Sequence, residues 1–271
     1  MMPFVEPNPD TARPPLNRDE QSDVIDLALW TGQLLLQHGA QCERVEKTIR
    51  RLVIGLGCDA VDTFISANAI IVTTTSGGEF RTKSRRILEG PVNMDIVARL
   101  SRLSHQVVRD DLNSEQVRAA LTRIASSPPL YNRWLIVVMI GLACAALSRL
   151  FGGDWVVFGI TWLSAGVAAF VRQELVRRHV HTLLMVSTTA FVAGLLASSA
   201  VWLQLSSQPE IALAASVLLL VPGVPLINMV LDFANKYTVV GLARGVTSAL
   251  VALSIAVGLL IAMTIAGVEQ L

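Results

Sequence analysis

The sequence is poor in charged residues and in cysteine. Charged residues make up 16% of the chain, against 52% hydrophobic residues, and the mean hydropathy is +0.55. This composition is too apolar for an ordinary soluble protein of 271 residues, so we expect a protein that resides in a lipid bilayer. The three cysteines, Cys42, Cys58 and Cys144, are odd in number and form no CxxC pair. This pattern argues against a disulfide framework and a zinc cluster, and we expect no metal and no cofactor.

Charge is also unevenly distributed along the chain. Residues 1–132 hold 15 of the 22 basic and 16 of the 21 acidic residues, so the second half is nearly free of charge. The first half has no excess of basic residues, and we therefore expect no nucleic-acid partner. Residues 1–17 are rich in proline and lack the apolar core of a secretory signal peptide. We expect a disordered tail there.

Residues 18–126 have the pattern of a small α+β domain. Asn17 and Glu20 resemble the capping box of a first helix, and Ser76-Gly77-Gly78 is typical of a turn between two strands. The expected elements, in chain order, are a helix over about 18–37, a helix around 45–56, an antiparallel meander within 61–87, and two helices that follow residues 90–93 and Asn113.

The second half, after a linker at 127–132, predicts a five-helix transmembrane domain over 133–271. Each apolar run is near the ~20 residues that cross a bilayer. The runs are Trp134–Phe151, Trp155–Val171, Thr182–Leu205, Ile211–Leu231 and Gly245–Gly267. The second run is the shortest, at 17 residues.

Charges between the apolar runs predict the orientation of the chain. Six basic residues at the ends of these runs fall on one side of the membrane, and only Arg149 falls on the other. The six are Arg133, Arg172, Arg177, Arg178, Lys236 and Arg244. Because basic residues favour the cytoplasmic side, we expect the N-terminus in the cytoplasm and the C-terminus in the periplasm of a bacterial inner membrane.

The most informative stretch is LLLVPGVPLIN, residues 218–228, within the fourth apolar run. Pro222 and Pro225 each remove a backbone donor, and Gly223 between them adds flexibility, so the helix should break at membrane depth. Broken helices line substrate cavities in transporters, because freed backbone groups and half-helix ends bind ions and anionic groups. We therefore predict a substrate path at Pro222, Gly223 and Pro225, with Asn228 and then Asp232 as further contacts.

A second pattern, His38, Cys42 and Glu46, would align a base, a thiol and a carboxylate on a continuous helix. Gly39 interrupts this helix in our interpretation, so we expect no catalytic residue.

Two stretches of the chain resemble the threonine/serine exporter family. The first is HGAQCERVEKTIRRL (38–52) with the later NAIIVTT, and the second is LLLVPGVPLIN with Asp232 and GLARG (241–245). The resemblance covers about residues 22–267. It implies a cytoplasmic N-terminal domain before a membrane bundle, and it implies the larger subunit of a split arrangement in which a second, smaller integral-membrane subunit supplies the remaining spans. The family includes single chains of about twice this length and systems implicated in succinate export.

The sequence thus predicts a subunit of an inner-membrane exporter for small carboxylates, either succinate-type dicarboxylates or threonine and serine. Two alternatives stay open at this point. One is a membrane-anchored hydrolase, and the other is a ligand-sensing membrane scaffold. The choice of substrate, the coupling ion and a possible higher oligomer are also left open by the residues alone.

Overall fold

The computed structural model describes residues 14–88, 90–128, 130–202 and 208–268. Most of the expected tail, residues 1–13, lies outside this range. The chain forms two compact units, residues 1–128 with 224–245 and residues 129–223 with 246–271. The sequence predicts that residues 224–245 belong to the transmembrane domain, whereas the contacts within the chain group them with residues 1–128.

The first unit begins with two helices, α1 (Arg18–Gln37) and α2 (Cys42–Gly55). The predicted capping box is present, because the Asn17 side chain accepts the backbone N–H of Glu20 while the Glu20 carboxylate accepts that of Asn17. A cap of this kind is worth about 1 kcal/mol, and it fixes where α1 begins. Gly39, with φ +89°, ends the first helix and allows the reversal into the second.

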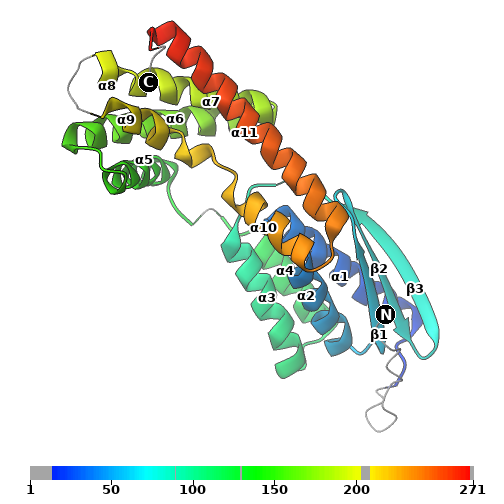
Figure 1. The fold of residues 1–271 in the computed structure, drawn as a ribbon. Helices are drawn as coiled ribbons and strands as arrows, with labels where there is room; N and C mark the ends of the chain where they lie inside the picture. Colours follow the sequence, from blue (N-terminus) through cyan, green and yellow to red (C-terminus); the bar gives the residue numbers. More distant parts are fainter. Residues whose placement is uncertain (1–13, 89, 129, 203–207, 269–271) are drawn as a thin grey trace. The chain divides into compact units, whose positions relative to one another are not determined.

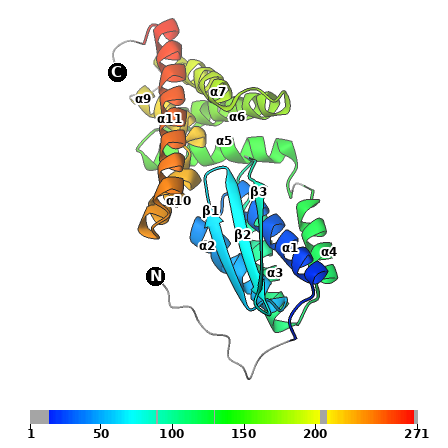
Figure 2. The ribbon, with the colours of Figure 1, turned by 90° about the vertical axis from the view of Figure 1, so that its right-hand side faces the viewer.

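A three-stranded antiparallel meander follows, as predicted. It consists of β1 (Ala60–Ile65), β2 (Ala69–Ser76) and β3 (Glu79–Arg86), in the order β1-β2-β3 (Figure 2). The register pairs Thr63 with Val72 and Val72 with Lys83. Alternate residues of β2, such as Ile70 and Val72, are fully buried. One face of the sheet therefore packs on the helices.

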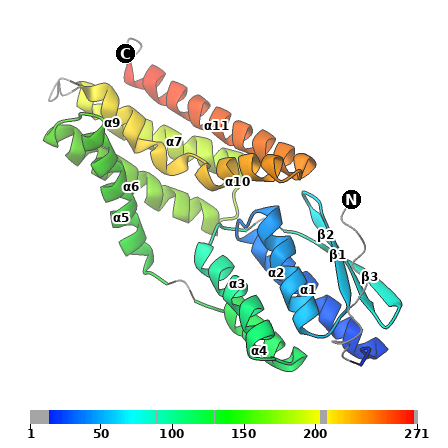
Figure 3. The same cartoon turned by 60° about the horizontal axis from the view of Figure 1, so that its bottom comes forward.

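The last two helices of this part are α3 (Met94–Arg109) and α4 (Ser114–Ala125), each begun by an asparagine cap. They pack on α1 and α2, and α1 and α2 in turn pack on the sheet, which gives three layers (Figure 1). Figure 3 shows α3 and α4 side by side. The buried core joins apolar residues of α1, α2, α3, α4 and the sheet, and it includes Val240 from the far end of the sequence.

The second unit is built from apolar helices. They are α5 (Arg133–Leu150), α6 (Trp155–Arg177), α7 (Thr182–Ala197), the short α8 (Ser199–Trp202), α9 (Pro209–Ser216), the 3₁₀ turn η2 (Leu218–Leu220) and the later part of α11 (Thr238–Ala266). Four helices in the described residues are long and apolar enough to cross a membrane, and the interrupted pair 209–220 with 223–234 would make five if it counts as one span.

Two helices are longer than the apolar runs that predicted them. α6 runs to Arg177 and has 23 residues rather than 17, and α11 starts at Thr238, seven positions before Gly245. The cause is that hydropathy falls at polar residues, whereas helical hydrogen bonding continues through them. As a result Arg172 and Arg244, expected in loops, lie on helices.

Candidate functional site: a broken helix and its contact with a loop

The chain breaks where the two prolines predict it. η2 ends at Leu220, Val221 is extended (φ −60°, ψ 125°), and α10 (Gly223–Ala234) begins two residues later. The residue before a proline is biased to this extended conformation, which stops the preceding helix. Pro225 lies in the first turn of α10, where a missing backbone N–H costs no helical hydrogen bond. The predicted break of the helix is confirmed.

After the break, α10 and the start of α11 form a helical hairpin. Lys236, with φ +68°, forms the turn between them. Gly241 and Gly245 face α10, because a Cβ at these positions would lie 3.2 Å from the carbonyl oxygen of Met229 and 2.7 Å from its sulfur. Small residues four apart let the two helices approach closely. The hairpin, residues 224–245, is the part of the sequence's second half that belongs to the first unit.

The hairpin contacts the loop between α1 and α2. The N-cap of α2, Gln41, makes no side-chain cap, so the first backbone N–H groups of this helix need another acceptor. The carboxylate of Asp232 supplies one, because its Oδ1 accepts the backbone N–H of Cys42 at 3.0 Å. A buried carboxylate at a helix N-terminus is also favoured by the helix dipole. Asp232, 1% exposed, thus caps α2 from the other end of the sequence.

Two more side chains of the hairpin bind the same loop. The amide of Asn228 donates to the carbonyl of Gly39 at 2.8 Å. Arg244 donates to Oδ2 of Asp232 at 2.7 Å and to the carbonyl of Ala40 at 2.9 Å. We call this contact the loop–hairpin junction, with Gly39, Ala40 and Cys42 on the loop side and Asn228, Asp232 and Arg244 on the hairpin side.

A further hydrogen bond lies beside the junction. The hydroxyl of Tyr237 donates to the carboxylate of Glu46, one turn along α2 from Cys42. Burial, together with the Glu46 carboxylate, raises the pKa of Tyr237 and keeps it a donor. Val240, 5% exposed, packs in the core of the first unit. The turn of the hairpin is therefore held by a hydrogen bond to α2 and by apolar packing in this core.

The geometry at His38 and Cys42 does not support a nucleophile. Burial, and then the Asp232 charge, raise the pKa of the Cys42 thiol to about 12, so it stays protonated at neutral pH. His38 Nδ1 lies 2.9 Å from the carbonyl oxygen of Pro91, and its backbone belongs to the end of α1 rather than to α2. The break at Gly39 removes the alignment that a continuous helix would have given.

A model of the putative threonine/serine exporter family matches residues 26–266 of this chain. The chain belongs to this family. It is 37% identical to the probable succinate transporter subunit YjjP of Escherichia coli (strain K12) over 258 residues, which are 94% of this chain and 99% of that protein. It is 23% identical to the probable threonine/serine exporter of Mycobacterium tuberculosis (strain ATCC 25618 / H37Rv) over 251 residues, which are 91% of this chain and 47% of that protein. No solved structure matches.

The two stretches that resemble the exporter family prove to be the two sides of one contact. The loop side of the junction lies in HGAQC, and its hairpin side lies in PLIN, Asp232 and GLARG. Of the predicted path residues, Pro222, Gly223 and Pro225 lie at the break, while Asn228 and Asp232 point to the loop. The sequence alone does not identify Arg244 as a site residue, because a charge between two apolar runs is equally typical of the cytoplasmic side of a membrane protein. The available signal was its place in GLARG, one of the stretches that resemble the family.

Proposed function

We propose that this member of the exporter family is one subunit of an inner-membrane exporter that moves small carboxylates out of the cytoplasm together with a second, smaller integral-membrane subunit. The substrates are succinate-type dicarboxylates or threonine and serine, as the names of its relatives suggest. The name of the Escherichia coli relative, a transporter subunit, supports the partner. The observation that carries the proposal is the helix broken at Val221 and Pro222 in a chain with four further apolar helices.

We place the substrate path at this break. The half-helix α10 begins at Gly223, and its first backbone N–H groups have no acceptor within the helix. Such a terminus and its dipole favour a carboxylate, the group that all three substrates share. Pro222 and Pro225 keep the terminus open by preventing a continuous helix.

The loop–hairpin junction then acts as the gate of this path. In the structure Asn228 and Asp232 are bound to the loop, so they reach a substrate only when the junction opens. Arg244 is the cation next to them, and a substrate carboxylate competes with Asp232 for its guanidinium. Substrate binding and opening of the junction are coupled in this mechanism. Asn228 remains our first candidate for direct contact, with Asp232 second.

The proposed topology is a cytoplasmic α+β domain over 18–126 and a five-span domain over 133–271, with the C-terminus in the periplasm. In the second unit, Gln173 near the end of α6 donates to the carbonyl of Arg133 at the start of α5, so these basic ends lie together. An alkaline phosphatase fusion at Leu271 should be active and one between Arg178 and His181 inactive. The reverse pair would refute the orientation.

Transport is tested in membrane vesicles from cells that lack the chain, with the chain restored or restored as Arg244→Gln. Counter-flow of labelled succinate, threonine and serine should appear with the wild type and fall strongly with Arg244→Gln. Arg99→Gln, which removes a partly exposed pair with Asp95 within α3, is the control and should keep transport. Equal counter-flow in all vesicles would refute the exporter. Full transport by the purified chain alone in liposomes would refute the need for a partner.

A variant of Cys42 tests the alternative that the protein is a membrane-anchored hydrolase. A protonated, buried thiol is a poor nucleophile, so Cys42→Ala should leave export unchanged at equal membrane abundance. Loss of export in that variant would restore the enzymatic interpretation. A ligand-sensing scaffold that transports nothing would show no counter-flow in any vesicle.

A further inference from the structure

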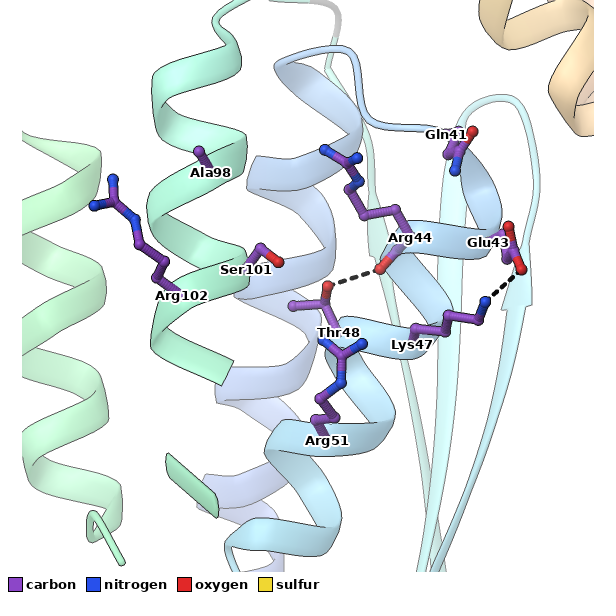
Figure 4. Close-up of a pocket in the computed structure, with 9 residues that line it drawn as sticks. All are labelled: Gln41, Glu43, Arg44, Lys47, Thr48, Arg51, Ala98, Ser101 and Arg102. Carbon is purple, nitrogen blue, oxygen red and sulfur yellow. Dashed lines mark hydrogen bonds and ion pairs between the residues drawn. The ribbon is translucent and has the colours of Figure 1, made fainter. Parts of the chain in front are cut away.

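A groove of about 380 Å³ lies between α2 and α3 in the first unit (Figure 4). It is lined by Gln41, Glu43, Arg44, Lys47, Thr48, Arg51, Ala98, Ser101 and Arg102. Of the three α3 residues that line it, Ala98 and Ser101 have small side chains, and this leaves the space in front of α2. None of its lining residues comes from α10 or α11, so the groove is distinct from the broken helix, although Gln41 lies between Ala40 and Cys42 of the junction.

The charge in this groove is positive. Arg44 and Arg51 extend from α2 into the space between the helices, whereas Arg102 points to the other side of α3 (Figure 4). The ammonium group of Lys47 forms an ion pair with Glu43, with 2.5 Å between Nζ and Oε1. Within the part of the chain that the structure describes, neither Arg44 nor Arg51 has an ion-pair or hydrogen-bond partner for its guanidinium. Two unpaired guanidiniums therefore face a concave space with no unpaired acid among its lining residues.

The spacing of these two arginines favours a ligand with two anionic ends. Arg44 and Arg51 are seven positions apart on α2, so their backbones are separated by about 10.5 Å along the helix axis. Between them the Thr48 hydroxyl already donates to the carbonyl of Arg44 at 2.7 Å. Each guanidinium can bind one carboxylate in a forked geometry. A compact anion such as phosphate would occupy only one of them.

The same helix carries the junction. The first residue of α2, Cys42, donates to Asp232, and Glu46 accepts from Tyr237, while Arg44, Thr48 and Arg51 face the groove. A ligand held by Arg44 and Arg51 lies along α2, in the groove whose other wall is α3, and α2 also carries the contacts to the hairpin. Binding in the groove therefore acts on the junction through a single helix of the first unit.

We propose that the α2–α3 groove binds a small dicarboxylate dianion through Arg44 and Arg51 and that its occupancy stabilises the loop–hairpin junction. The groove is separate from the path at the broken helix. The binding part stands by itself, whereas a regulatory role in export rests on the proposed function.

The binding is tested on the purified full chain in nanodiscs, with succinate as the probe and inorganic phosphate as the comparison. Arg44→Gln with Arg51→Gln should raise the Kd of succinate at least ~10-fold, because each variant removes charge-assisted hydrogen bonds. Arg50→Gln with Arg86→Gln removes the same charge from exposed positions outside the groove and should change the Kd less than about 2-fold. Equal effects of both pairs, or tighter binding of phosphate than of succinate, would overturn the dicarboxylate site.

A second measurement uses the wild-type chain and so does not depend on how the variants fold. Succinate should protect Arg44 and Arg51, but not Arg50, from modification by phenylglyoxal, as read by mass spectrometry. It should also slow labelling of Cys42 by maleimide if the junction is stabilised. Succinate bound only at the broken helix would protect neither arginine, and this result would refute the groove. Protection without any counter-flow in vesicles would instead refute the proposed export while the groove stands.

Discussion

Replacement of Arg244 by glutamine should open the loop–hairpin junction without unfolding the first unit. The variant leaves the carboxylate of Asp232, which is 1% exposed, without its cationic partner and leaves the carbonyl of Ala40 without this donor. The thiol of Cys42, fully buried beside Asp232, reports the opening, because it becomes accessible to maleimide only when the hairpin leaves the loop.

The expected size follows from the burial of the pair. Removal of one partner of a buried ion pair costs about 3 to 5 kcal/mol. Arg244 keeps 18% of its side chain exposed and Asp232 keeps the N–H of Cys42, so we expect the lower figure of about 2 to 3 kcal/mol. At about 1.36 kcal/mol per tenfold change, the open population and the labelling rate should rise by about 30- to 160-fold.

The assay is the labelling rate of Cys42 in the full chain at neutral pH, read by mass spectrometry. Cys58 is the internal control, because it is also buried in the first unit and burial raises its pKa to about 12 as well. Arg244 lowers the pKa of Cys42, so its loss alone would raise that pKa and slow the chemistry. Faster labelling of Cys42 can then come only from opening. An unchanged rate, or an equal rise at Cys58, would refute the junction as a local gate.

Three other outcomes are expected. Pro222→Ala with Pro225→Ala should restore a continuous helix and lower export at equal membrane abundance, whereas wild-type rates would remove the path from this segment. Gly39→Ala should lower the thermal midpoint of unfolding more than Gly78→Ala. Both glycines have positive φ, where an alanine costs about 1 to 2 kcal/mol, but of the two only a Cβ at Gly39 meets another residue, at 3.2 Å. Tyr237→Phe should speed labelling of Cys42 by about tenfold through loss of its hydrogen bond to a carboxylate, and no change would show that this bond contributes nothing.

Local features of this protein follow from the sequence because they depend on residues a few positions apart. Asn17 with Glu20, and Asn113 with Gln116, mark the starts of α1 and α4 through capping boxes that form within four residues. The turn at Gly77 and Gly78 joins β2 and β3 as predicted. The break before α10 also follows from the sequence, since Pro222 acts on its own backbone and on the residue before it.

Helix ends are less well determined where composition changes but hydrogen bonding does not. The apolar run before Arg172 stops at the first charge, whereas α6 continues to Arg177. α11 likewise begins before the apolar run at Gly245. Hydropathy measures the preference of side chains for lipid, and a helix can extend beyond the apolar part because its backbone bonds are satisfied internally.

The partners at the junction were decided by the tertiary structure alone. Asp232 was flagged by the sequence as the acid after the broken helix, but its role as the cap of α2 depends on a residue 190 positions away. The same holds for Arg244. In the sequence its charge indicates membrane orientation, and only the tertiary structure shows that it binds Asp232 and the carbonyl of Ala40. Periodicity and spacing report which face of an element is buried. They do not report which distant element supplies a missing hydrogen-bond acceptor, because that depends on how the chain closes in three dimensions.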